Sequence, residues 1–389
     1  MKLWQKNFKL NKAVEDFTVG NDCLLDKKLI KFDCIASVAH AKMLCKIKAL
    51  NKTELNQVIK ALNEILELNA KGKFKIKKED EDCHTAIENF LTKKLGKTGK
   101  KIHLGRSRND QVLAALRLYY KEEIDSVFKL SDELIKEMVL FNGKYGKIKM
   151  PGYTHMQKAM PSSVGLWIQA FIDSMKDNKK LIYCVQELLD QSPLGSGAGY
   201  GVPLKVDKKF TAKLLGFKKV QMNPLYVQNS RGKFEASFLH SLNQIMFDLN
   251  KLGSDLLFFS LEGLNYFELD AEICTGSSIM PHKKNPDVLE ILRAKYSENL
   301  ACEFQVKTLV SNLVSGYNRD FQLTKEPVFK ATENAMECLK VMQLVLKKIK
   351  VNKLACEKGI SEEMHSVEKC IGLVKKGIPF RDAYKELKN

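Results

Sequence analysis

The sequence predicts a mainly α-helical protein. Apolar residues recur every three or four positions over long segments, most clearly at residues 238–256, 289–314 and 328–349, which is the spacing of one buried helix face. Alternating strand patterns are scarce, and no proline interrupts the chain before Pro151. Together these observations predict a bundle of long helices over roughly residues 106–350.

Length and composition indicate a globular protein of more than one domain. The chain has 389 residues, of which 44% are apolar. No segment approaches the run of about 18 apolar residues that a membrane helix needs. The N-terminal "MKLWQKNFKLNK" lacks the apolar core of a secretory signal. We therefore expect neither a membrane span nor a signal peptide.

The cysteines predict a reducing compartment. Ten cysteines are scattered singly, with no CxxC pair and no spacing typical of a zinc site. In a chain of this length the pattern indicates reduced, mostly buried thiols. The expected location is the cytoplasm.

The net charge of +18 raises the possibility of a nucleic-acid partner, but its distribution argues against one. The lysines, 57 of the 64 basic residues, are spread along the whole chain, and no nucleic-acid motif is present. The few arginines are more informative, because a planar guanidinium is used where a forked contact is needed. Four of the seven lie in polar clusters: Arg106, Arg108, Arg231 and Arg319.

Six dense polar clusters separate the predicted helices. They are "EDCHTAIE" (81–88), "GRSRNDQ" (105–111), "GYTHMQKAMP" (152–161), "NSRGK" (229–233), "GSSIMPHKKNPD" (276–287) and "YNRDFQLTKEP" (317–327). Helix packing does not require such clusters, so we interpret them as parts of one composite site. The clearest candidates for strands or turns lie at residues 193–207.

The cluster at 276–287 has two interpretations. As a connecting loop, its glycine and serines turn the chain, and Pro286 begins the next helix with Asn285 as cap. As a functional loop, Ser277, Lys283 and Asn285 offer hydroxyl, cationic and amide groups to an anion or to charge that develops during a reaction. The residues alone leave both open.

His155 and the cluster at 105–111 are equally ambiguous. A lone histidine such as His155 is by default hydrogen-bonded at a helix end, but its polar neighbours make acid–base work plausible. In "GRSRNDQ", Ser107 or Asn109 can cap a helix whose dipole Asp110 favours, or the arginines and free N–H groups can bind a carboxylate.

His84 is the last candidate site residue that the sequence indicates. It is either a structural partner of Asp82 or part of the site. No set of metal ligands at helical spacing is present, so we expect no metal.

The clusters carry a family resemblance. "GSSIMPHKKNPD" resembles the fumarase/aspartase superfamily signature, whose general form is Gly-Ser-Ser-x-Met-Pro-x-Lys-x-Asn. "HTAIE", "GRSRNDQ", "PGYTH", "SPLGSG" and "YNRDFQLTKEP", with "KLW" and "KKGIPFRDAYKEL" near the two ends, resemble the argininosuccinate lyase branch over essentially the whole chain. The resemblance implies reversible, cofactor-free elimination of argininosuccinate to arginine and fumarate, a step of arginine biosynthesis.

The resemblance also implies roles for individual residues. Ser277 would be the base, ionised with the help of Lys283, and His155 its acid–base partner. The substrate-binding residues would be Ser107, Arg108, Asn109, Thr154, Asn285, Tyr317, Gln322 and Lys325. Three more residues would contact the substrate-binding residues without contacting the substrate: Asp82, His84 and Arg231.

The implied fold has three mainly helical domains. These would be an N-terminal domain (1–105), a central bundle (106–350) with the signature loop at 274–290, and a short C-terminal domain (351–389). Central helices of four chains would form a twenty-helix core in a homotetramer, with each active site shared between chains.

Several positions depart from the family pattern. Met160 stands where a glutamine is usual, "NSRGK" replaces a Ser-Asp-Arg-Asp run, and Asp22 stands where many members carry a substrate-binding serine. The chain also ends soon after "FRDAYKEL", where relatives commonly continue.

Two other functions are alternatives to that of an argininosuccinate lyase. Another superfamily lyase (adenylosuccinate lyase, fumarase or aspartase) is disfavoured by "GRSRNDQ" together with "YNRDFQLTKEP". A structural protein recruited from the enzyme, like a lens crystallin, is disfavoured because Ser277, Lys283, His155 and Asn109 are all intact.

Overall fold

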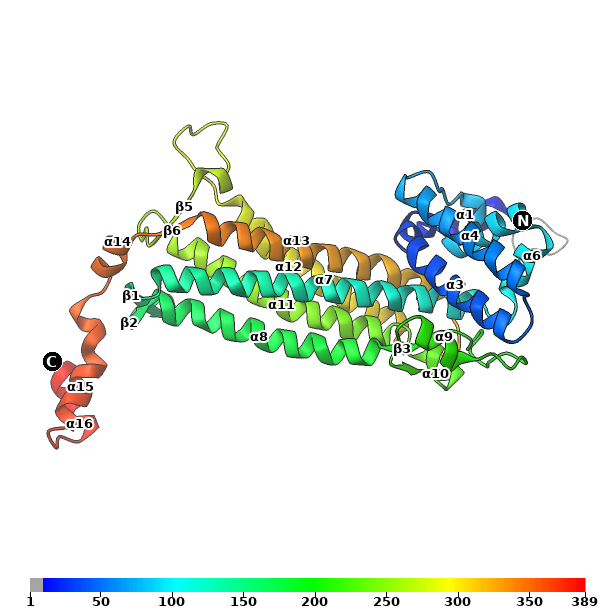
Figure 1. Cartoon of the computed structure of the whole chain (residues 1–389). Helices are drawn as coiled ribbons and strands as arrows, with labels where there is room; N and C mark the ends of the chain where they lie inside the picture. Colours follow the sequence, from blue (N-terminus) through cyan, green and yellow to red (C-terminus); the bar gives the residue numbers. More distant parts are fainter. Residues whose placement is uncertain (1–9, 389) are drawn as a thin grey trace. The chain divides into compact units, whose positions relative to one another are not determined.

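The computed structural model describes residues 10–388, which are mainly helical (Figure 1). The three segments with helical periodicity correspond to α11 (Lys233–Phe259), α12 (Asp287–Val310) and α13 (Lys325–Lys348), although the segment at 289–314 runs beyond the end of α12. The prediction of a mainly α protein is therefore confirmed. The "KLW" motif lies outside the described residues.

Backbone packing divides the described chain into two units. The first unit contains residues 10–126, 182–240 and 301–332, and the second contains 127–181, 241–300 and 333–388. Each unit thus combines three separate stretches of sequence. The division into three consecutive domains stays a prediction.

The first unit is built from short helices and the ends of longer ones (Figure 1). Its elements are α1 (Lys12–Val19), α2 (Asp22–Leu25), the 3-10 helix η1 (Asp26–Lys28), α3 (Ile30–Lys46), α4 (Lys52–Ala70), η2 (Lys78–Asp80), α5 (Cys83–Leu95), α6 (Lys97–Lys100), η3 (Lys101–His103), β3 (Gln191–Ser192), α9 (Lys208–Leu214), β4 (Lys219–Val220), α10 (Pro224–Asn229) and η5 (Arg319–Thr324). The first part of α7 (Arg108–Tyr145) belongs to it as well, and α3 packs against α4 and α5.

Small side chains allow close packing in the first unit. Ala36 and Ala39 of α3 lie in one buried cluster with Ala114 of α7, and Leu194 and Phe217 fill the space around them. Alanine costs little entropy in a helix and lets neighbouring backbones approach. This packing holds the first turns of α3 and α7 together, and these turns carry the polar side chains of Asp33 and Arg108.

The start of α7 follows the capping prediction. The backbone N–H of Asn109 donates to Ser107 Oγ at 3.3 Å, and the N–H of Ser107 donates to Asp110 Oδ1 at 2.8 Å. This is a reciprocal capping box, with Ser107 as the cap. The other oxygen of Asp110 accepts from the N–H groups of Gly195 and Gly197, which ties the 193–207 segment to the helix start. That segment forms turns, as predicted.

The second unit holds the remaining parts of the long helices, including α8 (Val164–Leu189), whose last turns belong to the first unit. Its other elements are β1 (Lys149–Thr154), β2 (Gln157–Ser163), β5 (Phe267–Leu269), η4 (Ala271–Ile273), β6 (Ile349–Val351), α14 (Lys353–Lys358), η6 (Glu362–His365), α15 (Ser366–Val374) and α16 (Phe380–Lys388). β1 pairs with β2 and β5 with β6, both antiparallel. The β1–β2 hairpin was not anticipated from the sequence.

An aromatic cluster holds the second unit together. The ring of Trp167 lies 5.2 Å from Phe267 and 5.7 Å from Phe259, and its Nε1 donates to Asp255 Oδ2 at 2.9 Å. A buried tryptophan is stable in such a core because its single donor is satisfied. β1 and β2 continue directly into α8, so this core also orients the hairpin.

All ten cysteines lie in the described part of the chain, and each is a free thiol, as the sequence predicts. None of the helices among residues 10–388 combines the length and the apolar character needed to cross a bilayer.

Candidate active site

Eight of the predicted site residues line one pocket in the first unit, which we call the Lys325 pocket. Five of them were predicted to bind substrate: Arg108, Asn109, Tyr317, Gln322 and Lys325. The other three were predicted to contact these binding residues: Asp82, His84 and Arg231. The cavity between them has a volume of about 20 Å³. That is room for about one water molecule, so the side chains here are closely packed around a small opening.

Lys325, at the start of α13, is the buried cation of this pocket. Its Nζ lies 2.6 Å from Asp26 Oδ1 and 2.8 Å from Asp22 Oδ1, and its side chain is only 3% exposed. Burial opposes the charge of Lys325, but the two carboxylates outweigh burial and raise its pKa. The same ammonium, with His84, holds the pKa of Asp26 below its ordinary value although burial acts in the opposite direction. Lys325 and Asp26 are therefore both charged.

Replacing Lys325 with methionine is expected to lower the free energy of unfolding by about 3–5 kcal/mol, because Asp26 would stay buried without its cation. Denaturant unfolding followed by circular dichroism measures the change. Lys78→Met is the matched control: Lys78 pairs with Asp16 at 2.8 Å, but both side chains are largely in solvent. Its unfolding midpoint should stay close to that of the parent, and equal losses in the two variants would contradict the role given to Lys325.

Arg108 has its charge balanced in the same way. Its Nη1 lies 3.1 Å from Glu81 Oε2 and 3.0 Å from Asp82 Oδ2. Asp82 also caps α5, where its Oδ1 accepts the N–H of Thr85 at 2.8 Å. Arg108 is thus oriented by two fixed carboxylates, and a guanidinium has five N–H donors, so others remain for a ligand.

His84 is a buried, paired histidine. Its Nδ1 lies 3.2 Å from Asp33 Oδ2, and Gln111 Nε2 donates to both oxygens of that carboxylate. Burial opposes protonation of the imidazole, but Asp33 outweighs it and raises the pKa of His84. The sequence suggested Asp82 as a structural partner of His84. The structure shows that this partner is Asp33. His84 nonetheless lines the Lys325 pocket.

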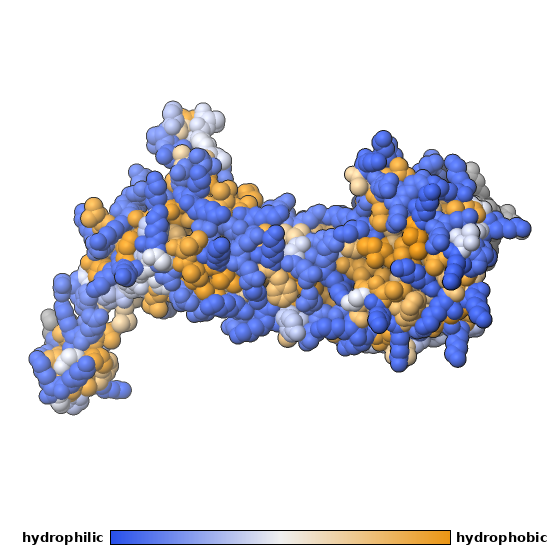
Figure 2. All heavy atoms as spheres, viewed as in Figure 1, coloured by the Kyte–Doolittle hydropathy of each residue, from blue (hydrophilic) through white to orange (hydrophobic). Residues whose placement is uncertain are grey.

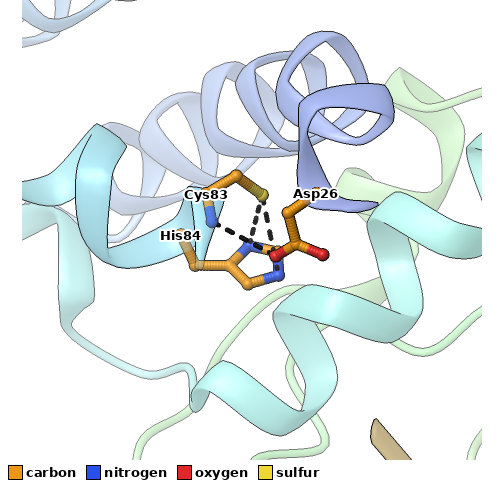
Figure 3. A group of neighbouring side chains, drawn as sticks. All are labelled: Asp26, Cys83 and His84. Atoms are coloured by element: carbon orange, nitrogen blue, oxygen red, sulfur yellow. Dashed lines mark hydrogen bonds between the residues drawn. The ribbon is translucent and has the colours of Figure 1, made fainter. Parts of the chain in front are cut away.

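Three potential metal ligands lie close together, as Figure 3 shows: Asp26, Cys83 and His84. Asp26 and His84 also line the Lys325 pocket. Each already has a partner in the chain. Asp26 accepts from Lys325 and from the N–H of Cys83 at 3.2 Å, and His84 is paired with Asp33. Burial raises the pKa of the Cys83 thiol, which disfavours the thiolate that binds metals. The positive charge next to these three residues is that of Lys325, which pairs with Asp26. The absence of a metal stays a prediction.

Gln322 positions the wall of the Lys325 pocket. Its Nε2 donates to the carbonyl oxygens of Thr18 at 3.0 Å and Val19 at 3.2 Å, at the end of α1. With its amide N–H groups engaged, Gln322 can offer a ligand only the acceptor oxygen Oε1. The guanidinium of Arg231 lies over the ring of Phe321, 5.6 Å from its centroid.

A second group of predicted residues lines a cleft of about 1120 Å³ in the second unit, which we call the His155 cleft. His155, Lys283 and Asn285 belong to its lining, together with apolar residues such as Trp167 and Phe258. Ser277 and Thr154 are not part of that lining. This cleft is wide enough for a metabolite and combines apolar walls with a few polar groups.

His155 lies in the tight turn between β1 and β2, not at a helix end, so that expectation was wrong. Thr154 pairs with Gln157 across the hairpin, and the two residues of the turn, His155 and Met156, have φ of 51° and 60°. Two positive φ values define the tight turn that suits a right-twisted hairpin, although glycine or asparagine usually occupies it. Side chains held in this strained conformation are concentrated at functional sites. The His155 imidazole is exposed.

The signature loop is a closed loop between η4 and α12. The backbones of Thr275 and Asn285 exchange hydrogen bonds of 2.9 and 2.8 Å, and Asn285 Nδ2 donates to the carbonyl of Gly276 at 3.1 Å. Asn285 therefore closes the loop instead of capping α12. The carbonyl of Pro286 accepts the first helical bonds of α12, which begins one residue later than predicted, at Asp287.

Ser277 is held at the centre of a turn in this loop. Its Oγ accepts the N–H of Met280 at 3.0 Å and that of Ile279 at 3.3 Å. Two backbone donors directed at one hydroxyl oxygen stabilise negative charge on it, as an ionised serine requires. Lys283 follows in the same loop, and its side chain is exposed.

Sequence reasoning missed two buried carboxylates, Asp26 and Asp33. Both are fully buried, and they hold Lys325 and His84 respectively. Both could have been noticed in "DKKLIKFDCIA" (26–36), where Asp26 and Asp33 lie among apolar residues. An acidic residue on the apolar face of a helix is buried with its charge and therefore needs a partner. Met160, at the departure noted above, lies on β2 with its side chain 44% exposed.

The chain is similar to known lyases over nearly its whole length. Residues 5–298 match a family model described as "Lyase". The argininosuccinate lyase of Thermotoga neapolitana is 51% identical over 384 residues, covering 99% of this chain and 96% of the relative. The argininosuccinate lyase of Phocaeicola vulgatus is 40% identical over 386 residues, covering 99% and 86%.

Solved structures share the fold. The crystal structure of EDDS lyase in complex with formate has a TM-score of 0.85 at 21% identity and covers 98% of this chain and 76% of that one. Class II fumarase from Schistosoma mansoni has a TM-score of 0.78 at 17% identity, covering 96% and 91%. The fold is thus the mainly α lyase fold predicted from the sequence. On the sequence matches, the chain belongs to the argininosuccinate lyase family of the fumarase/aspartase superfamily.

Proposed function

We propose that the protein cleaves argininosuccinate into arginine and fumarate, a step of arginine biosynthesis that is reversible and needs no cofactor. The observation that carries the proposal is the 51% identity to an argininosuccinate lyase over 99% of the chain. The polar groups of the Lys325 pocket and the His155 cleft support it, because each contains residues of the family's motifs.

The difficult step is removal of a proton from a carbon that is barely acidic, next to a carboxylate. In the proposed mechanism Ser277 Oγ, as alkoxide, takes that proton, and the electron pair forms the carbon–carbon double bond of fumarate. The bond to the guanidinium nitrogen breaks, and the nitrogen leaves with its electron pair and takes up a proton. His155 serves as the acid–base partner, and a positioned group of this kind contributes about 10²–10⁴-fold.

Before the bond breaks, negative charge accumulates on the substrate carboxylate. Preorganised donors that hold such charge are worth about 3 kcal/mol each. Lys283, whose side chain is exposed in the signature loop, is proposed to supply such a donor, together with backbone N–H groups of that loop. Asn109, Ser107, Arg108, Thr154 and Asn285 are proposed to contact the substrate, while Tyr317, Gln322 and Lys325 hold its arginine end.

We further propose a homotetramer whose active sites are shared between chains. Several large apolar side chains on the long helices of the second unit are exposed, among them Phe247 (47%), Ile291 (59%) and Leu344 (48%). Hydrophobic residues reach the surface among hydrophilic ones on the face seen in Figure 2. Such residues on helices of a bundle support association with further helices. The free cysteines support a cytoplasmic location.

The purified protein is expected to release fumarate from argininosuccinate, followed as an increase in ultraviolet absorbance. Adenylosuccinate, malate and aspartate, tested in parallel, should give no comparable rate. The oligomeric state of the same sample is measured by light scattering. A tetrameric sample that releases no fumarate from argininosuccinate would exclude the proposed activity.

A further inference from the structure

The β1–β2 hairpin, which carries His155 in its turn, packs against a segment near the C-terminal end of the chain. α14 contacts β1 and η6 contacts β2, and Figure 1 shows α14 beside the hairpin. All four elements belong to the second unit. We call residues 353–365, from the start of α14 to the end of η6, the C-terminal brace.

Tyr266 joins the hairpin to the C-terminal brace. Its hydroxyl forms a hydrogen bond of 2.9 Å with the hydroxyl of Tyr153 on β1, two residues before His155. Its carbonyl oxygen accepts the N–H of Asn352 at 2.8 Å and the thiol of Cys356 on α14 at 3.7 Å. Tyr266 is only 2% exposed, so it links β1 to α14 through buried hydrogen bonds.

Gly359, at the end of α14, packs tightly against Tyr266 and the hairpin. A Cβ on this glycine would lie 2.5 Å from the hydroxyl oxygen of Tyr266 and 2.9 Å from Cγ of Pro151 on β1, both inside normal contact distance. The carbonyl oxygen of Gly359 accepts from Nζ of Lys158 on β2 at 2.6 Å. The φ of Gly359 is −67°, which any residue adopts, so the lack of space and not the backbone conformation favours glycine here.

The turn itself does little to hold His155. Its imidazole is exposed, and among residues 10–388 no hydrogen bond or ion pair engages it. His155 and Met156 both have positive φ, a strained conformation that persists only where the surrounding structure enforces it. The position of the imidazole therefore depends on the two strands, and both strands rest on the C-terminal brace.

We propose that the C-terminal brace positions His155 for the reaction, with Gly359, Tyr266 and Lys158 as positioning residues that do not touch the substrate. This inference rests on the proposed function, in which His155 is the acid–base partner of Ser277. It gives the short C-terminal part of the chain a role in activity. The role matters because misplacing a reacting group by about 1 Å can lower a rate about 10²-fold.

Gly359→Ala tests the proposal, because the added methyl group must push Tyr266 or Pro151 away and shift β1. The kcat for argininosuccinate is expected to fall between about tenfold and about 10²-fold. KM should change by less than about twofold, because the Lys325 pocket is unaltered. In a His155→Ala protein, the same substitution should lower the residual kcat no further, since the group that it misplaces is already gone.

Hydrogen–deuterium exchange of the full-length protein provides a readout that does not depend on activity. Gly359→Ala should accelerate exchange in the hairpin, residues 149–163, because the strands lose their support. Gly372→Ala is the matched control: this glycine lies in α15, where an added Cβ would meet no atom within 4 Å. It should change neither kcat nor exchange in the hairpin.

Unchanged exchange in the hairpin of Gly359→Ala would overturn the proposal. An equal loss of kcat with and without His155 would also overturn it, because the effect would then be a general structural one. Turnover by the unmodified protein, measured in the same preparation, tests the proposed function separately from the C-terminal brace.

If Gly359→Ala does not fold, Lys158→Met decides, because it removes the bond to the Gly359 carbonyl at an exposed side chain. Lys149→Met is its control, at an exposed lysine on β1 of the same hairpin. A lower kcat at constant KM in Lys158→Met alone would support the proposal. Equal kcat values in the two variants would contradict it.

Discussion

Replacing Ser277 with alanine is expected to reduce turnover of argininosuccinate by about 10²–10⁴-fold, the contribution of a positioned base. The alanine cannot take the substrate proton, and the N–H groups of Ile279 and Met280 lose the oxygen on which they converge. Because the change is confined to an exposed loop, the oligomer and its unfolding transition should persist. Fumarate absorbance measures the rate, and light scattering measures the oligomer.

Two variants in the same loop separate the chemistry from loop geometry. Ser278→Ala removes the adjacent hydroxyl, which is exposed, and should retain most of the activity. Thr275→Val removes the hydrogen bond from Thr275 to Asp287 and loosens the loop while Ser277 stays in place. An active Ser277→Ala enzyme, or a Thr275→Val enzyme that is equally inactive, would refute Ser277 as the base.

Mixing two inactive variants is expected to restore activity. In a tetramer assembled at random from His155→Ala and Ser277→Ala chains, about one site in four combines an intact His155 with an intact Ser277, provided that the two residues come from different chains. Each variant alone should remain inactive. The measurement is fumarate release after the two proteins are dissociated and reassembled together.

The control for this experiment uses two residues of one loop. Ser277 and Lys283 both belong to the signature loop of a single chain, so mixing Ser277→Ala with Lys283→Ala chains cannot create an intact loop. That mixture should stay inactive after the same treatment. If the mixture of His155→Ala and Ser277→Ala chains also stays inactive, the sites are not shared in the proposed way.

Much of the fold and of the site composition could be predicted from the sequence. Helical periodicity located α11, α12 and α13, because the apolar face of a packed helix repeats every 3.6 residues along the chain. The cap at Ser107 was also predictable, since its partner Asp110 is only three residues away. Polar clusters between helices indicated the residues that line the Lys325 pocket and the His155 cleft.

Local signals also misled where pairing decides the structure. His155 was expected at a helix end, but β1 and β2 pair and place it in a hairpin turn with positive φ. Asn285 was a candidate cap for α12 in one of the two interpretations of its loop, but its backbone pairs with Thr275 and its side chain closes the loop. In both cases a partner elsewhere in the sequence outweighs the local preference.

The sequence by itself determined the helical class, the family and the residue types available for the reaction. Only the tertiary structure decided which charges balance one another. Lys325 meets Asp22 and Asp26 across about 300 residues, and His84 is held by Asp33 rather than by its neighbour Asp82. Burial makes such pairs obligatory, because an ammonium or carboxylate out of water is stable only beside its counterion, and the position of that counterion depends on the packing of α2, η1, α3, α5 and α13.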